Sequence, residues 1–116
     1  MPDFSSIQGL QGYLSVLSNR QQLIVSNMAN VDTPGYHTQD LDFRGAMRQV
    51  MNEGGNLDLV PASRELQGLP ERPDGNNVSI DRESLQLSET QLQYQLGVQL
   101  LKSKFHQLLT AIKEGN

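Results

Sequence analysis

The stretch that decides the fold is residues 80–114, IDRESLQLSETQLQYQLGVQLLKSKFHQLLTAIKE. Ten of its positions follow one another at alternating steps of four and three, and eight of the ten are apolar. This spacing puts them on one side of an α-helix and is the a/d pattern of a coiled coil. Ser79 or Asp81 can cap the start of such a helix, and Gly115 follows its end. The row consists of Ile80, Ser84, Leu87, Gln91, Tyr94, Val98, Leu101, Phe105, Leu108 and Ile112.

Further leucines widen the apolar side of this predicted helix. A stripe this wide is more than one partner helix can cover. The sequence therefore predicts that residues 80–114 contact more than one neighbour. The additional leucines are Leu85, Leu92, Leu96, Leu100 and Leu109.

A second helix is predicted over residues 5–31, with Ser5 or Ser6 as its cap. It ends at Pro34-Gly35, where proline fixes φ at the second position of a turn and glycine supplies the positive φ at the third. Seven of the eight positions in its a/d row are apolar. That row consists of Ile7, Leu10, Leu14, Leu17, Gln21, Ile24, Met28 and Val31.

The two rows predict a mainly α fold in which the terminal helices pair as an antiparallel, coiled-coil-like hairpin. Setting Val31 level with Ile80 brings Leu14 opposite Val98 and Gln21 opposite Gln91. Two facing glutamines can fix the register, because a slip by one heptad would bury each amide against an apolar side chain. The alternative is that both glutamines sit at a solvent-exposed edge.

The middle of the chain, residues 32–79, is predicted to be irregular. One short helix is expected over residues 42–51, where apolar residues share a face. Residues 52–77 contain four glycines and three prolines, which favours a long, exposed and flexible loop. The whole chain, residues 1–116, is predicted to form one domain.

Composition narrows the function classes. Apolar residues make up 36% of the chain and aromatic residues 5%, so a core built by one copy would be thin. The chain is therefore expected either to fold only marginally alone or to have its fold completed by partners. A net charge of −4 with scattered basic residues argues against a nucleic-acid surface. The chain has no cysteine, no run long enough to span a membrane and no predicted cleavable signal sequence.

The sequence offers no convergent set of chemical groups. His37 and His106 lie in different zones, and neither has further metal ligands or a catalytic partner at a suitable spacing. Asp42 is explained by capping of the short helix. We therefore predict a protein that is not an enzyme, holds no cofactor or metal and takes no small-molecule substrate.

The stretch from Ser26 to Tyr36, SNMANVDTPGY, resembles the N-terminal signature Ala-Asn-x-x-Thr-Pro-Gly-Tyr of flagellar rod and hook proteins. Further on, Asp40–Phe43, Asp74–Glu83 and Gln93–Gln95 resemble the FlgB type of proximal rod protein. One departure is Ser84, where the family usually carries a larger apolar residue. The residues of this family turn motif are Ala29, Asn30, Thr33, Pro34, Gly35 and Tyr36.

The resemblance implies a structural subunit of the proximal rod of the bacterial flagellar basal body, which transmits torque across the periplasm. Its implied partners are copies of itself, other rod proteins, the ring–rod adapter, and the membrane ring with its export gate. Export by the flagellar type III apparatus fits the missing signal sequence. The implied assembly seam is the whole first row together with the second row from Leu87 to Ile112. The alternative function is a soluble helical adaptor or chaperone-like binding module, which has no need of the turn motif.

Overall fold

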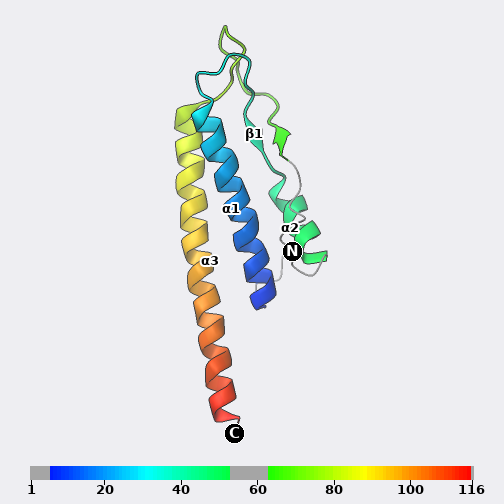
Figure 1. Ribbon diagram of the computed structural model, residues 1–116, viewed down its shortest axis with the longest axis vertical. Coiled ribbons are helices and arrows are strands. Elements are labelled where there is room, and N and C mark those ends of the chain that lie inside the picture. The colour runs from blue at the N-terminus through cyan, green and yellow to red at the C-terminus, as the bar shows by residue number, and fades with distance from the viewer. Residues whose placement is uncertain (1–5, 53–62, 116) are drawn as a thin grey trace.

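The computed structural model describes residues 6–52 and 63–115 of the chain. Two long helices, α1 (Ile7–Ala29) and α3 (Ile80–Glu114), run antiparallel and pack against each other (Figure 1). The chain between them carries the short helix α2 (Phe43–Asn52) and the strands β1 (Gln39–Asp40) and β2 (Arg64–Glu65). The predicted mainly helical hairpin with a loop-rich middle is confirmed.

The molecule is long and narrow, with extents of 68 × 25 × 20 Å. α1 lies between α3 on one side and β1 with α2 on the other (Figure 1). α3 is the longer helix, 35 residues against 23, and its C-terminal part runs beyond the first residue of α1. None of the described helices is both long enough and apolar enough to cross a membrane.

Side-chain caps set the starts of both long helices. The hydroxyl of Ser6 accepts a hydrogen bond from the Gly9 amide at 2.9 Å, and that of Ser79 accepts one from the Arg82 amide at 3.2 Å. α3 has the bounds that the sequence predicts. α1 is two residues shorter at its C-terminal end, because the amide of Val31 bonds to Met28 three residues back and the chain passes into tight turns.

The apolar core lies between α1 and α2. Its fully buried members include Val16 of α1 and Met47 of α2. Tyr13 and Phe43 close one side with an edge-to-face contact, ring centroids 5.8 Å apart. A Cβ on Gly12 would stand 2.9 Å from the Val50 side chain, so this glycine is what lets α2 approach α1. The core cluster consists of Val16, Leu41, Ala46, Met47 and Val50.

The middle segment holds a small antiparallel sheet that the sequence does not predict. Gln39 of β1 pairs with Glu65 of β2, and the Leu66 amide then donates to the Thr38 carbonyl at 3.0 Å. Strands of two residues are too short to leave an alternating pattern. The predicted helix over 42–51 appears one residue later, as α2. Part of the predicted flexible loop, residues 53–62, lies outside the described residues.

Candidate assembly surface

The most deeply buried positions of α3, where it meets α1, hold small or polar residues. Glu83, Thr90 and Gly97 are the buried residues of α3. A Cβ on Gly97 would stand 2.7 Å from Leu14 and 3.4 Å from the ring of Tyr13. Because glycine leaves that space open, the two helices come into close contact at this level.

This packing corrects the predicted pairing within one chain. Leu14 lies against Gly97, the neighbour of the predicted partner Val98, so the register is right to within one residue. α3 is turned, however, so that Gln91 is exposed, and the expected glutamine layer does not form. A different polar pair joins the helices instead: the Asn27 amide donates to the Glu83 carboxylate at 3.1 Å.

The first half of the predicted assembly seam, the row from Ile7 to Val31, is covered by the chain itself. Every member of this row is buried or half-buried. Ile24 is 3% exposed, and Leu10 and Leu17 are fully buried. Contacts within one chain therefore cover much of this half, and its role in assembly stays a prediction.

The second half of the predicted seam lies on α3 and is more open. Leu87, Val98 and Leu101 are half-buried. The other members are exposed, so their role in assembly stays a prediction: Gln91, Tyr94, Phe105, Leu108 and Ile112.

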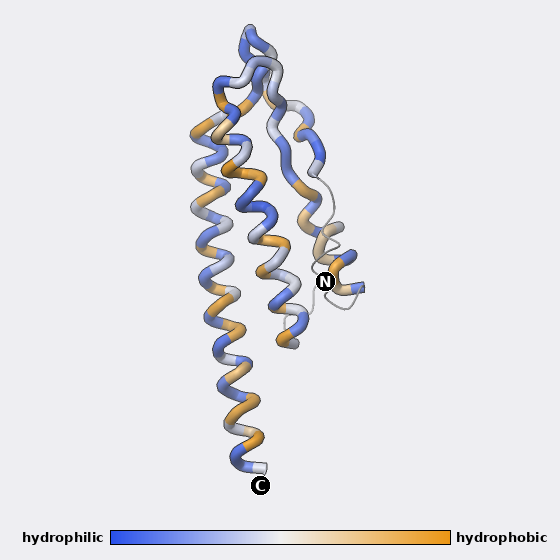
Figure 2. The backbone as a smooth tube through the Cα atoms, viewed as in Figure 1, coloured by the Kyte–Doolittle hydropathy of each residue, from blue (hydrophilic) through white to orange (hydrophobic). Residues whose placement is uncertain are grey.

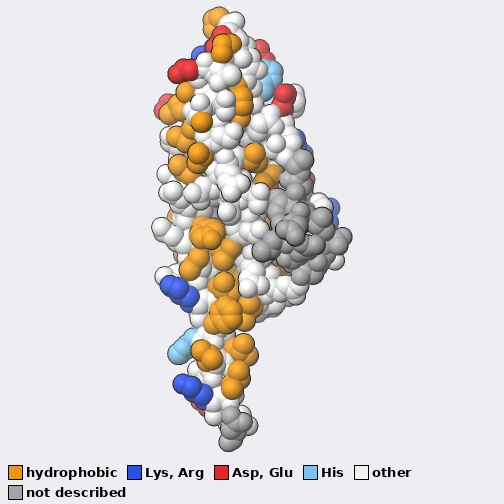
Figure 3. Space-filling view, viewed as in Figure 1, with side chains coloured by type: hydrophobic (Ala, Val, Ile, Leu, Met, Phe, Trp, Pro, Cys, Tyr) orange, Lys and Arg blue, Asp and Glu red, His pale blue; other side chains and the backbone are white. Residues whose placement is uncertain are grey.

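Two groups of large apolar side chains remain exposed on α3. Figure 2 shows that apolar residues recur along the length of this helix. The first group lies on the sides of the helix that α1 leaves uncovered and consists of Leu85, Leu92, Leu96 and Leu100. The second covers the C-terminal part of α3, where apolar side chains form an almost continuous band (Figure 3). Its members are Phe105, Leu108, Leu109 and Ile112, which are 44–57% exposed.

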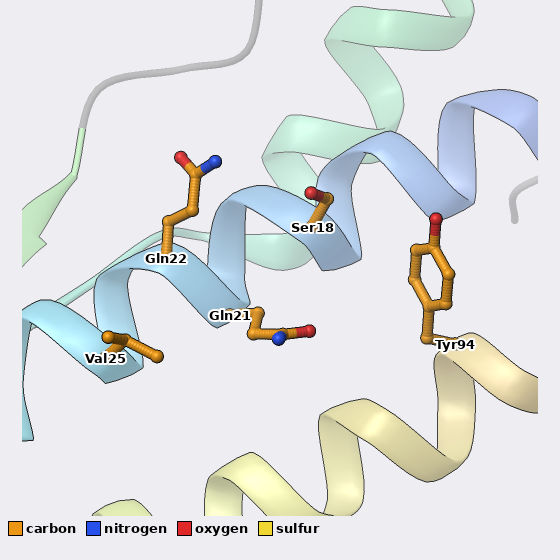
Figure 4. A pocket seen from close by; sticks show the side chains of 5 residues that line it. All are labelled: Ser18, Gln21, Gln22, Val25 and Tyr94. Atoms are coloured by element: carbon orange, nitrogen blue, oxygen red, sulfur yellow. The ribbon is translucent and has the colours of Figure 1, made fainter.

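A hollow of about 440 Å³ lies between the long helices. Figure 4 shows Gln21 of α1 and Tyr94 of α3 on its two sides. Val25, also on its wall, is 51% exposed. Among the described residues that line it, only the tyrosine is ionisable. The hollow thus has the character of an uncovered gap between two helices and not of a reaction site.

A network of buried polar side chains closes the end where the long helices are joined. Asn27 is at its centre: its Nδ2 donates to the Gln39 carbonyl at 2.8 Å and to Glu83, while its Oδ1 accepts from the Gln39 amide and the Tyr36 hydroxyl, each at 3.0 Å. One side chain thus joins α1, the turn, β1 and α3. Sequence reasoning missed this role of Asn27, although the residue lies only two positions before the turn motif.

The turn motif contributes backbone geometry to the same end of the molecule. Gly35 has φ of 75°, and its amide donates to the Asp74 carbonyl at 2.9 Å. A Cβ on Gly75 would stand 3.4 Å from the Cα of Gly35. The two glycines therefore lie against each other where the turn after α1 meets the segment before α3. Asn76 is buried and donates to the carbonyls of Asn30 and Thr33 at 2.9 and 2.8 Å.

His37 lies between two carboxylates on the outside of this region. Its Nδ1 is 3.4 Å from Glu65, and its Nε2 is 3.1 Å from Glu71. The hydrogen bond to Glu65 and the negative charges of both glutamates raise the pKa of His37. When protonated, the ring bridges Glu65 of β2 and Glu71 of the segment that follows it. No group of metal ligands forms in the described parts of the chain.

We expect the Glu65→Gln variant to lower the pKa of His37, because the largest cause of its upward shift is removed. In the parent, the folded-state pKa is raised, so the contact stabilises the fold below the ordinary histidine value of about 6.5 and is lost as the pH rises through the folded value. An NMR titration of the His37 ring measures the pKa in both proteins. Glu89→Gln on α3 is the matched control, and an unchanged His37 pKa in Glu65→Gln would contradict the contact.

Comparison with known proteins gives a consistent result, although no family model matches the chain. The chain is similar to the flagellar basal body rod protein FlgB of Escherichia coli, with 32% identity over 91% of each chain. The FlgB proteins of Aeromonas hydrophila and Bacillus subtilis are 31% and 27% identical, each over 95% of both chains. This chain therefore belongs to the FlgB family of flagellar basal body rod proteins.

Proposed function

We propose that this protein is a structural subunit of the proximal rod of the flagellar basal body and transmits torque across the periplasm. The observation that carries the proposal is the exposed apolar surface of α3. It covers the sides of the helix that α1 leaves free and continues along the C-terminal part, where the large apolar side chains are 44–57% exposed. Surfaces of this kind mark sites of protein association.

The shape of the molecule supports the same role. Two antiparallel helices form a rod-like unit 68 Å long, and exposed leucines line the part of α3 that faces outward from the pair. Neighbouring subunits packed along that surface would form a continuous helical layer. The proposed partners are copies of this chain, other rod proteins, the ring–rod adapter, and the membrane ring with its export gate. Export by the flagellar type III apparatus completes the proposal.

The arrangement gives no support to catalysis. The buried polar groups, such as Asn27 and Glu83, are engaged in hydrogen bonds that join segments of the chain. His37 is held by carboxylates at the surface, and His106 lies exposed on α3. Nothing in these contacts brings a nucleophile and a base to one cavity.

Complementation tests the proposal. The gene is deleted in the source bacterium and replaced by a tagged copy, and basal bodies are purified for electron microscopy. We expect the tag in the proximal rod and restored motility. His37→Ala and His106→Ala should remain motile, since neither histidine takes part in chemistry. Normal rods and motility in the deletion strain, with the tagged chain absent from basal bodies, would refute the proposed function.

A further inference from the structure

The two ends of the molecule differ in charge. The turn end, defined as residues 31–37 and 69–83, carries five acidic and two basic residues, a formal net charge of −3. The C-terminal end of α3, defined as residues 102–115, carries three lysines and one glutamate, a formal net charge of +2. The two ends lie at opposite extremes of the long axis (Figure 1).

Interaction of charged residues with the helix dipole of α3 explains only part of the charge difference between the two ends. Acidic residues at the start of a helix and basic residues at its end are stabilising, which accounts for Asp81, Glu83 and Lys113. Asp32 and Asp74 lie outside the helix, and Lys102 lies well before its last turn, where the dipole has little effect. Asp74 accepts a hydrogen bond from the Asn76 amide at 3.0 Å and so has a role within the turn, whereas neither explanation covers Asp32 and Lys102.

The turn end also has a hollow of about 490 Å³. Its apolar wall includes Leu69, Pro70 and Val78, together with Val31 and Ile80. The polar side chains that also line it, Glu71, Arg72, Asn77 and Ser79, each have a partner within the chain. Apolar side chains of a second molecule could therefore be received there without burying an unpaired polar group.

The hollow lies at the negatively charged end of the molecule, and its own lining holds one acid and one base, Glu71 and Arg72. The guanidinium of Arg72 donates to two backbone carbonyls, and Arg82 pairs with Glu83 at 2.7 Å. Asp32 and Asp81, each next in sequence to a residue of the apolar wall, are exposed and contribute to the negative charge of the turn end. A partner that enters the hollow would thus gain from carrying positive charge beside its apolar side chains.

The opposite end of the molecule carries these complementary features. Phe105 and Leu108 are 44% and 48% exposed and share one face of α3, and Lys102, Lys104 and Lys113 stand around them. We propose that the C-terminal end of α3 docks into the hollow at the turn end of a second copy of this chain. The contact is head-to-tail: apolar side chains enter the hollow while lysines meet the exposed acidic residues of the turn end. This proposal rests on the assembly role proposed above.

Net charge disfavours the symmetric alternative, because it would join two ends that each carry +2, even though Glu114 of one copy would lie near Lys102 and Lys104 of the other. If the C-terminal ends of two copies paired antiparallel about Leu108 and Leu109, Lys104 of one copy would lie level with Lys113 of the other. Like charges facing each other oppose association, whereas the head-to-tail contact joins opposite charges. A contact between two different surfaces of one chain is heterologous, so it repeats along a line or closes a ring and does not stop at a dimer.

Cysteine cross-linking tests the contact, because the chain has no native cysteine. Full-length Leu69→Cys, carrying an N-terminal tag that changes its size, is mixed with untagged Leu108→Cys and oxidised. We expect mixed dimers in clear excess over the statistical share, falling several-fold at about 1 M salt because the charges are screened. Leu69→Cys with Gln95→Cys is the control for random collision. Mixed dimers at the control level, or an excess of Leu108→Cys homodimers, would overturn the proposal.

Charge exchange gives a second readout. Lys104→Glu with Lys113→Glu in the Leu108→Cys chain should lower the yield of mixed dimers to the control level. Asp32→Lys with Asp81→Lys in the Leu69→Cys chain should restore it, and failure to restore it would also count against the contact. The result is separable from the proposed function: a chain that enters basal bodies but gives no mixed dimers refutes the head-to-tail contact alone.

Discussion

The Asn27→Asp variant is expected to lose about 3 kcal/mol or more of its free energy of unfolding at neutral pH. The change removes the Nδ2 donor that serves the Gln39 carbonyl and Glu83, and it sets a second carboxylate beside one that is 1% exposed. Urea denaturation followed by circular dichroism measures the loss. Gln22→Glu makes the same amide-to-carboxylate change at an exposed position of α1 and should have little effect.

The pH dependence of the same variant identifies the cause. The neighbouring Glu83 charge raises the folded-state pKa of the introduced carboxyl above its unfolded value of about 3.9. Protonation therefore favours the fold, so the variant should be least destabilised relative to the parent below that value and lose stability as the pH rises through the folded pKa. A deficit that stays constant between acidic and neutral pH would show that repulsion from Glu83 is not responsible.

The Phe105→Asp variant is expected to abolish rod assembly and motility while leaving the single chain nearly as stable as the parent. Phe105 is 44% exposed and belongs to the C-terminal part of α3, so the chain itself buries only part of this side chain. In an assembled rod the same position would bury an unpaired charge, which is strongly unfavourable.

Two measurements are needed, because a misfolded variant would also fail to assemble. The midpoint of urea denaturation reports the fold, and recovery of the chain in purified basal bodies reports assembly. Gln95→Asp is the matched control: it adds the same charge to α3 on the polar side shared with Lys102 and His106. Normal assembly of Phe105→Asp would remove the C-terminal part of α3 from the subunit interface.

The sequence predicts the long helices well because their signals are local. Ser79 at the start of α3 and Gly115 at its end give the bounds that the structure shows. The a/d row on α1 picks out residues that are buried or half-buried, since α1 is covered on two sides. The rotation of α3 about its own axis could not be predicted, because its apolar stripe is wide enough for several different faces to pack against α1.

The remaining differences depend on contacts between distant residues. Gly97 faces α1 because the space beside Leu14 admits nothing larger, and an apolar pattern cannot reveal a position chosen for small size. From the sequence alone, Asn27 and Glu83 are expected to be surface residues, because only the fold brings these distant positions together. The apolar character of the candidate assembly surface was therefore predicted from the sequence. The polar network at the turn end was not predicted.

The polar network at the turn end also bears on the order in which the chain folds. Hydrogen bonds between the two halves span 39 residues at Thr38–Asn77, 56 at Asn27–Glu83 and 66 at Arg20–Gln86. Closing a shorter loop costs less entropy, and each contact shortens the loop that the next one must close. We expect the pairing of α1 with α3 to begin at the turn and to spread toward the free ends of the helices. The C-terminal end of α3 would then be the last part to become ordered.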